Sequence, residues 1–266
     1  MRRSRLVTIL ASATAAVFAS LVLAVPAQAA STVRYVALGD SYASGVGAGS
    51  YTSESGTCKR STNAYPALWA AAKAPASYKS VACSGATTTS VVNTQLSALA
   101  TNTTLVSITV GGNDVGFANI MTTCVLKGTT ECVAAVQAAQ NKATTELPGL
   151  LDKVYSGIKS RSPSAKVVVV GYPVFYELGK VCVGLSETSR AKINEGINIL
   201  DGVLIKAAAR HGFKFADVRA NFVGHQLCSG DKWLHALNFA DIGISYHPFA
   251  TGQSGGYLPA FRAAAG

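Results

Sequence analysis

The chain has 266 residues, 49% of them hydrophobic, and a formal net charge of +10 at pH 7. This length accommodates one large domain or two small ones. A basic chain favours anionic partners such as phospholipid headgroups, acidic wall polymers or nucleic acid, although a diffuse solvated basic surface explains the charge equally well. No Lys/Arg run with interleaved aromatic residues is present, so we expect no nucleic-acid partner.

The first thirty residues have the three-part pattern of a secretory signal peptide. A positive start over 1–5 precedes an apolar run over 6–25, and an A-x-A cleavage site lies at 27–29. We expect a leader over 1–30 and a single secreted domain over 31–266, with a membrane anchor as the alternative. The early arginine pair leaves the choice between the Sec and twin-arginine routes open. The leader holds three arginines and no acid, so its removal lowers the net charge to about +7.

The cysteine content fits an exported protein. Six cysteines follow the leader, and an even number in an exported chain predicts three disulfides. Pairing them in sequence order closes the shortest loops, although other pairings are possible. No two cysteines have C-x-x-C spacing, which argues against a zinc site. The cysteines are Cys58, Cys83, Cys124, Cys132, Cys182 and Cys228.

Apolar, β-branched runs alternate with helical patterns. Strands are predicted at 34–38, 78–82, 105–110, 166–170 and 214–218. Four of these runs are continuously apolar, which is typical of strands buried on both faces of a parallel sheet. Helices are predicted at 64–74, 131–160, 186–211 and 248–264, with Pro148 breaking the second and Ser186 capping the third. The alternation predicts one three-layer α/β domain, with loops at 45–63, 124–132 and 175–185.

Polar residues follow three of the predicted strands. The three strand-end motifs are Gly39-Asp40-Ser41-Tyr42, Cys83-Ser84-Gly85-Ala86 and Gly111-Gly112-Asn113-Asp114. Because the carboxyl ends of parallel strands meet at one edge, these motifs should supply a hydroxyl, a free glycine N–H and an amide to one site. Acyl transfer through an oxyanion needs such donors beside its nucleophile.

Four histidines are candidates for the base. His211 precedes a glycine at a helix end, where we expect a capping role. His225 and His235 lie in an irregular stretch and are interpreted as surface or packing residues. His247 directly precedes Pro248 at a predicted helix start, which can turn its ring toward the strand ends. We therefore expect His247 to be the base.

The three strand-end motifs and His247 together resemble the motifs of the SGNH hydrolases, also called GDSL lipases or esterases. The resemblance implies an α/β/α fold with a five-stranded parallel sheet in flavodoxin-like order. It implies Ser41 as nucleophile, His247 as base, and Ser41 N–H, Gly85 N–H and Asn113 as the oxyanion hole. The chain is similar to the secreted actinomycete lipases and phospholipases of the family, whose disulfides are sequential. That similarity implies the pairs Cys58–Cys83, Cys124–Cys132 and Cys182–Cys228.

One position departs from the pattern of many family members. They carry Asp three residues before the catalytic histidine, and this chain has Ile244 there. A backbone carbonyl can orient the imidazole instead, although it offers a dipole rather than a charge. The resemblance assigns that carbonyl to Ser245, so we expect a Ser41–His247 dyad. Asp241 is the alternative acid.

Two further patterns need an interpretation. Gly45, Gly47 and Gly49 superficially resemble a dinucleotide loop, but their spacing is not G-x-G-x-x-G. Six aromatic residues flank the strand ends or the base, where they can line an acyl groove or simply pack the core. These aromatic residues are Tyr42, Phe117, Tyr172, Phe175, Tyr176 and Tyr246.

The resemblance implies a secreted serine hydrolase that cleaves lipid esters, either acylglycerols, phospholipids or both, with no metal or organic cofactor. We expect a monomer that contacts lipid surfaces transiently, and the basic charge favours an anionic lipid surface. A carbohydrate acetyl esterase with the same residues is the enzymatic alternative. An inactive binding protein and a protease are the remaining rivals. Retention of all four site residues argues against the inactive scaffold.

Overall fold

A computed structural model describes residues 31–266, so the predicted leader over 1–30 lies outside the described residues. Five parallel strands form one sheet in the order β2-β1-β3-β4-β5, which confirms the predicted sheet and its order. The strands are β1 (Arg34–Gly39), β2 (Ser77–Ser80), β3 (Leu105–Thr109), β4 (Lys166–Val170) and β5 (Lys214–Ala216). Each overlaps a predicted strand.

The burial of the strands follows their sequence patterns. The continuously apolar runs of β1, β3 and β4 lie in the middle of the sheet, and nearly all of their residues are buried. The edge strand β2 alternates exposed and half-buried residues. Only strands covered on both faces need continuous apolar sequence, which explains the difference.

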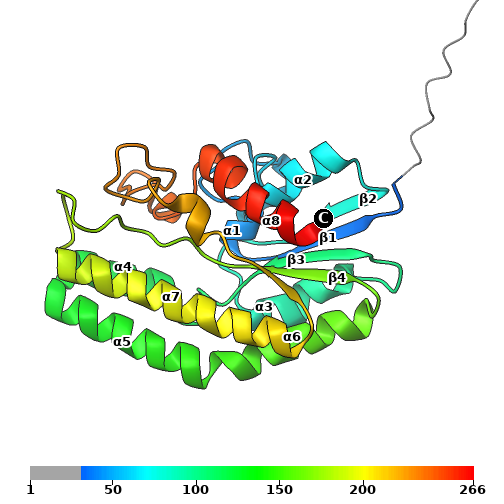
Figure 1. The fold of residues 1–266 in the computed structure, drawn as a ribbon, viewed down its shortest axis with the longest axis horizontal. Helices are drawn as coiled ribbons and strands as arrows, with labels where there is room; N and C mark the ends of the chain where they lie inside the picture. The colour runs from blue at the N-terminus through cyan, green and yellow to red at the C-terminus, as the bar shows by residue number, and fades with distance from the viewer. Residues whose placement is uncertain (1–30) are drawn as a thin grey trace, which may run out of the picture. The chain divides into compact units, whose positions relative to one another are not determined.

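Helices cover both faces of the sheet (Figure 1). On one side lie α2 (Tyr65–Lys73) and α8 (Leu258–Ala265), and on the other lie α5 (Thr129–Thr145), α6 (Leu147–Arg161) and α7 (Glu187–Arg210). Three further α-helices are α1 (Ser41–Ser44), α3 (Thr88–Ser90) and α4 (Phe117–Lys127). The predicted three-layer architecture is confirmed. No helix within residues 31–266 combines the length and the apolar content needed to cross a membrane.

Two local predictions are wrong. The segment 124–132 is not a loop, because Cys124 is a buried residue of α4 and Cys132 lies in α5. Only Gly128, at φ +88°, separates the two helices. The last helix does not begin at Pro248, which instead forms a bridge with Leu234. Helical structure starts two residues later and passes through a π-helical turn before α8.

Three disulfides join segments around the sheet. They link Cys58 to Cys83, Cys124 to Cys132, and Cys182 to Cys228. The first ties the loop after α1 to the end of β2, and the second ties α4 to α5. The third holds the loop before α7. Cross-links of this kind stabilise the fold by restricting the unfolded chain.

Candidate active site

The segment that presents Ser41 is fixed at the carboxyl end of β1. Gly39 has φ +128°, and a Cβ there would collide with the backbone oxygen of Thr109. The Gln95 side chain accepts from the Gly39 N–H at 2.7 Å and donates to the Gly39 carbonyl at 2.8 Å. Asp40 then caps α1, because its Oδ1 accepts from the Tyr42 N–H at 2.9 Å. Ser41 is therefore the first residue of a short helix at a strand end.

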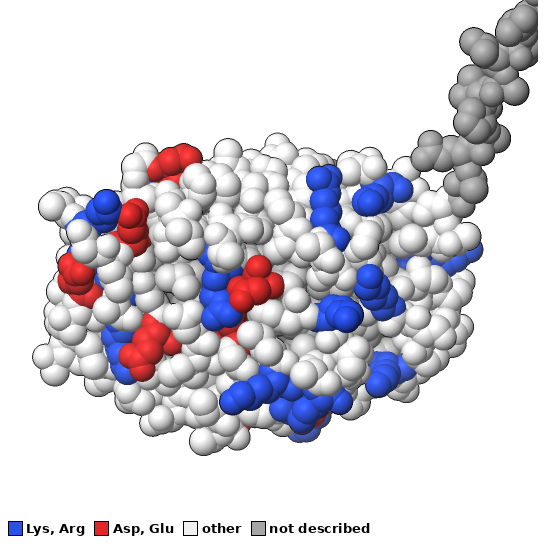
Figure 2. Space-filling view, in the orientation of Figure 1, with Lys and Arg blue, Asp and Glu red and all other residues white. Residues whose placement is uncertain are grey.

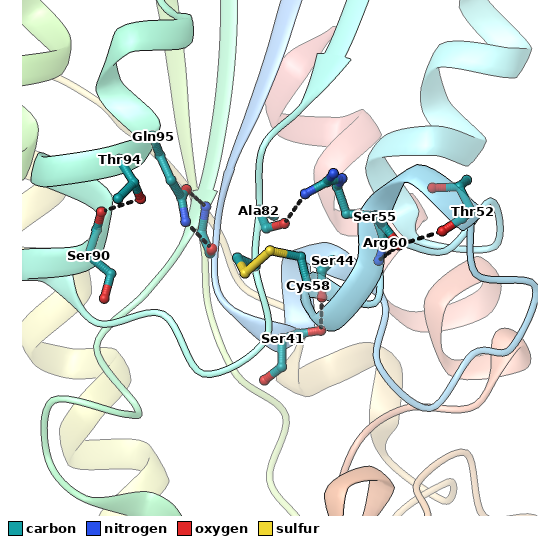
Figure 3. The surroundings of a disulfide bond; sticks show 12 residues. Ser41, Ser44, Thr52, Ser55, Cys58, Arg60, Ala82, Ser90, Thr94 and Gln95 are labelled. Atoms are coloured by element: carbon teal, nitrogen blue, oxygen red, sulfur yellow. Dashed lines mark hydrogen bonds between the residues drawn. A yellow bond between two sulfur atoms is a disulfide. The ribbon is translucent and has the colours of Figure 1, made fainter.

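The first disulfide fixes the neighbouring loop. Figure 3 shows the bond of Cys58 to Cys83 in one view with Ser41, Ser44 and Gln95. The Ser84 N–H donates to the Cys58 carbonyl at 3.1 Å. The end of β2, with the predicted oxyanion glycine two residues beyond Cys83, is thus held beside Ser41.

His247 lies within hydrogen-bond distance of Ser41. Its Nε2 is 2.7 Å from the Ser41 Oγ, and its Nδ1 is 3.1 Å from the Ser245 carbonyl oxygen. His247 itself lies in no helix or strand, but backbone bonds at 2.9 Å join Tyr246 and His247 to His235. The Tyr42 hydroxyl donates to the Tyr246 carbonyl at 2.9 Å, which links the histidine segment to the residue after Ser41.

The imidazole is buried and faces a carbonyl instead of a carboxylate. Burial lowers the pKa of His247 to about 4, and the hydrogen bond to the Ser245 carbonyl only partly offsets this effect. Asp241 lies elsewhere: its Oδ1 accepts from the Gly243 N–H at 3.2 Å, and its Oδ2 is 3.9 Å from the Lys59 Nζ. His247 is consequently neutral at pH 7, the state in which its Nε2 can accept a proton.

Three donors lie at the strand ends. Neither the Ser41 N–H nor the Gly85 N–H has an acceptor among the described residues. Gly85 has φ +77°, which glycine adopts without strain. The Asn113 Nδ2 donates to the Ala86 carbonyl at 3.0 Å, and this leaves its second hydrogen for a ligand. Asp114, next to Asn113, accepts from the Thr88 N–H and hydroxyl and so ties the two loops together.

Tyr172 connects the Ser41 segment to the Asn113 segment. Its hydroxyl donates to the Asp40 Oδ2 at 2.6 Å and accepts from the Gly112 N–H at 3.1 Å. Burial raises the pKa of Asp40 to about 7, although the bonds from Tyr172 and Tyr42 lower it. The sequence pattern marks Tyr172 only as an aromatic residue near a strand end, because nothing in it shows that the hydroxyl spans two loops.

A cavity of about 510 Å³ opens above these residues. Ser41, Gly85, Asn113 and His247 line it, and its wall is largely apolar. Side chains from α5 and α7 make up much of that wall: Val136, Ala139, Ile193, Ile197 and Leu200. Five of the six aromatic residues noted in the sequence also line the cavity, whereas Tyr176 lines a neighbouring hollow. The volume is in the range of sites that enclose small organic ligands.

The other histidines lie away from the Ser41 hydroxyl. His211 is the C-cap residue of α7, with its Nε2 2.9 Å from Asp152. His225 stacks on Trp233 with 3.5 Å between ring centroids. The His235 Nε2 is 2.8 Å from the Gly47 carbonyl. Glycine at position 47 permits this contact, because a Cβ there would lie 3.0 Å from both the His235 Cδ2 and the His247 Cβ.

The chain matches the model of the GDSL-like lipase/acylhydrolase family over residues 37–254, a range that contains Ser41, Asn113 and His247. This chain belongs to that family. Lipase 1 of Streptomyces coelicolor is 55% identical to this GDSL hydrolase over the full length of both chains.

Two solved structures share its fold closely. Phospholipase A1 from Streptomyces albidoflavus is 55% identical in sequence. Its crystal structure matches with a TM-score of 0.86 over 87% of this chain and 99% of that chain. The extracellular lipase of Streptomyces rimosus is 54% identical, with a TM-score of 0.85 over 87% and 99% of the two chains. The protein is a carboxylic ester hydrolase of the GDSL family.

Proposed function

We propose that this protein is a secreted lipid-ester hydrolase that works through an acyl-enzyme on Ser41, activated by a Ser41–His247 dyad. The observation that carries the proposal is the 2.7 Å contact between His247 Nε2 and Ser41 Oγ, with the other ring nitrogen on the Ser245 carbonyl. Nucleophile and base are thus within hydrogen-bond reach, and a third group orients the base.

The first half of the reaction forms the acyl-enzyme. His247 Nε2 takes the Ser41 hydroxyl proton while Ser41 Oγ attacks the ester carbonyl carbon, and the carbonyl oxygen becomes an oxyanion. The Ser41 N–H, the Gly85 N–H and the Asn113 amide donate to that oxygen. When the intermediate collapses, the bond to the alcohol breaks and His247 returns the proton to the leaving oxygen.

The second half releases the acid. His247 removes a proton from water, whose oxygen attacks the acyl carbon and forms a second oxyanion in the same hole. Collapse breaks the bond to Ser41 Oγ, which regains the proton from His247 and leaves the free carboxylic acid. The cycle needs a neutral imidazole at its start, and burial provides one by lowering the pKa of His247 to about 4.

The cavity wall supports a lipid acyl chain as the substrate group beside Ser41. Val136, Ile193, Ile197 and Leu200 give an apolar surface that a hydrocarbon chain can bury at a gain of about 0.8 kcal/mol per CH₂. A sugar acetyl ester would leave much of this wall uncovered. The relatives named lipase and phospholipase A1 also support acylglycerols or phospholipids as substrates. Secretion is proposed from the leader pattern, the disulfides and the extracellular lipase of S. rimosus.

Parallel assays of one preparation test the proposed substrate class. Triacylglycerol and phosphatidylcholine should be hydrolysed, with rates on soluble esters rising from acetyl to longer acyl chains. Acetylated xylan should be a poor substrate. A preference for acetylated xylan over all lipid esters would contradict the lipid assignment and favour the carbohydrate esterase. A phosphonate probe should label the protein at Ser41, and absence of labelling would contradict Ser41 as the nucleophile.

A further inference from the structure

The mouth of the cavity that contains Ser41 lies among large apolar side chains that are exposed to solvent. Val181 and Val183 are fully exposed, Phe239 is 83% exposed and Leu126 is 73% exposed. Leu126, Phe239 and Ile242 line the cavity mouth, and the two valines line a second hollow that shares Phe239 with it. We call these five residues the apolar rim. Exposed apolar side chains gathered in one patch mark an interaction site, whereas single exposed apolar residues are common on protein surfaces.

The loop that carries the two valines is held in place. Cys182, which lies between them, is bonded to Cys228. The Gly179 N–H before them donates to the Glu187 Oε1 at 2.8 Å. These bonds hold the chain before the first valine and between the two, so the exposure of the valines is a property of the folded loop.

The charges next to the rim nearly balance. Segments 126–131, 177–190 and 231–242 carry four basic and five acidic residues in total. Lys180 lies 3.6 Å from Glu177, and Lys59 reaches Asp241 at 3.9 Å from outside these segments. Exposed pairs of this kind contribute little energy, and they leave the rim with almost no net charge.

The positive charge of the domain gathers at the opposite edge of the sheet. Arg34, Lys166 and Lys214 begin β1, β4 and β5. Helix ends add basic residues there, including Lys73 in α2 and Arg210 in α7, as the helix dipole favours. Figure 2 shows Lys and Arg over the half of this face where β1 begins, and Asp and Glu mixed with them toward the other end. A basic surface would favour an anionic lipid surface, but the cavity mouth carries no excess of basic charge.

We propose that the apolar rim docks the enzyme on a lipid surface by burial of side chains rather than by charge, with the cavity mouth facing the lipid. This inference rests on the proposed lipid-ester activity. Continuity between rim and cavity argues for a lipid surface as the occupant, because substrate could pass from it directly to Ser41. A second copy of the chain on the same rim would cover that entrance.

The double variant Val181→Ser/Val183→Ser tests the rim without touching the Ser41 cavity. In a Ser41→Ala background, co-sedimentation with phosphatidylcholine vesicles should show a partition coefficient lower by about tenfold or more. Vesicle binding of the protein with an unsubstituted rim should change little between low and high salt. Salt screens interactions between exposed charges, and apolar contacts do not depend on them. The matched control is Val223→Ser, which changes a 70% exposed valine that lines neither hollow and should leave partition unchanged.

The same double variant with Ser41 intact separates docking from chemistry. Its kcat/KM on a short soluble ester should equal that of the parent enzyme, while its rate on vesicles falls. Equal vesicle partition of parent and double variant would overturn the proposal. So would binding that requires anionic lipid and disappears in Lys79→Glu/Lys214→Glu, two exposed lysines away from the rim.

Sedimentation without lipid tests the competing occupant. A monomer is expected for parent and variant alike, whereas a parent dimer that Val181→Ser/Val183→Ser dissociates would assign the rim to a second copy and overturn the proposal. Partition is measured without turnover. Failure of the proposed lipid hydrolysis would therefore appear in the rate assays alone, and failure of the docking proposal would appear in the partition.

Discussion

Ser41 lies at the end of a buried parallel strand, whereas His247 lies in a segment without helix or strand. The serine side has local features of its own, the Gly39 backbone and the Asp40 cap, and the Gln95 and Tyr172 side chains reinforce it from a distance. The histidine side is fixed by long-range backbone bonds to His235 and by the Tyr42 hydroxyl. The serine side of the site therefore has a local signal in its own sequence, whereas the histidine side depends wholly on the packing of distant segments.

The largest expected effect comes from removing either member of the pair. Ser41→Ala and His247→Ala should each lower kcat on a soluble ester by on the order of 10⁴- to 10⁶-fold, because the two side chains act as one unit. The double variant should lose no more than either single variant. Full additivity of the two losses would show that serine and histidine act independently, and a thermal melt checks that each variant is folded.

Asn113→Ala comes next. It removes one of the three proposed donors to the oxyanion while Ser41 and His247 remain in contact, so kcat should fall about 100- to 1000-fold with little change in KM. Steady-state kinetics on the same ester measure the effect. A loss below about fivefold would remove Asn113 from the oxyanion hole.

Tyr172→Phe tests the connection between the loops of the serine side. It removes the Tyr172 hydroxyl as the partner of the buried Asp40 Oδ2 and of the Gly112 N–H, while Asp40 Oδ1 keeps its bond to the Tyr42 N–H, and the cost should be about 2 kcal/mol in the free energy of unfolding. We expect kcat to fall less than in Asn113→Ala, because no donor to the substrate is lost. Urea unfolding and steady-state kinetics measure the two effects.

The matched control is Tyr155→Phe. The Tyr155 hydroxyl is also buried but has no hydrogen-bond partner within residues 31–266, so its removal should leave stability unchanged or slightly higher. Equal destabilisation by both substitutions would show that loss of the Tyr172 hydrogen bonds is not the cause.

The pH dependence tests the histidine side. His247 is a base only when neutral, and kcat/KM falls as pH drops through its pKa. Because burial lowers the pKa of His247 to about 4, activity on a soluble ester should hold to about pH 5 and decline below it. Ile244→Asp places a carboxylate near the ring, which favours the imidazolium and should move the acid limb to higher pH.

Ile244→Asn is the uncharged control and should leave the acid limb in place. An acid limb near pH 7 in the parent enzyme would contradict the effect of burial. Equal shifts in the Asp and Asn variants would show that local packing, and not the added charge, moves the pKa.

The sequence predicts the sheet, its strand ends and the serine side well, because buried parallel strands have continuous apolar runs and end in polar turns. It predicts α4 and the bend at Gly128 poorly. A glycine between two cysteines resembles a loop, and only the packing of α4 against α5 shows that the helices approach so closely.

The histidine segment has no comparable local signal. A helix start at Pro248 is the wrong reason for the position of His247, since Pro248 pairs with Leu234 instead. The roles of Gln95 and Tyr172 depend on contacts across 56 and 132 residues of sequence, which no local pattern encodes. The family resemblance, rather than periodicity, supplies the pairing of Ser41 with His247.

Asp241→Ala is the smallest expected effect and the most direct test of a dyad oriented by a backbone carbonyl. Asp241 is half exposed and pairs with Lys59, so its removal should change kcat/KM on a soluble ester by less than about twofold. The variant should be assayed beside His247→Ala in one preparation series. A loss in Asp241→Ala as large as that in His247→Ala would contradict the dyad and establish a Ser–His–Asp triad.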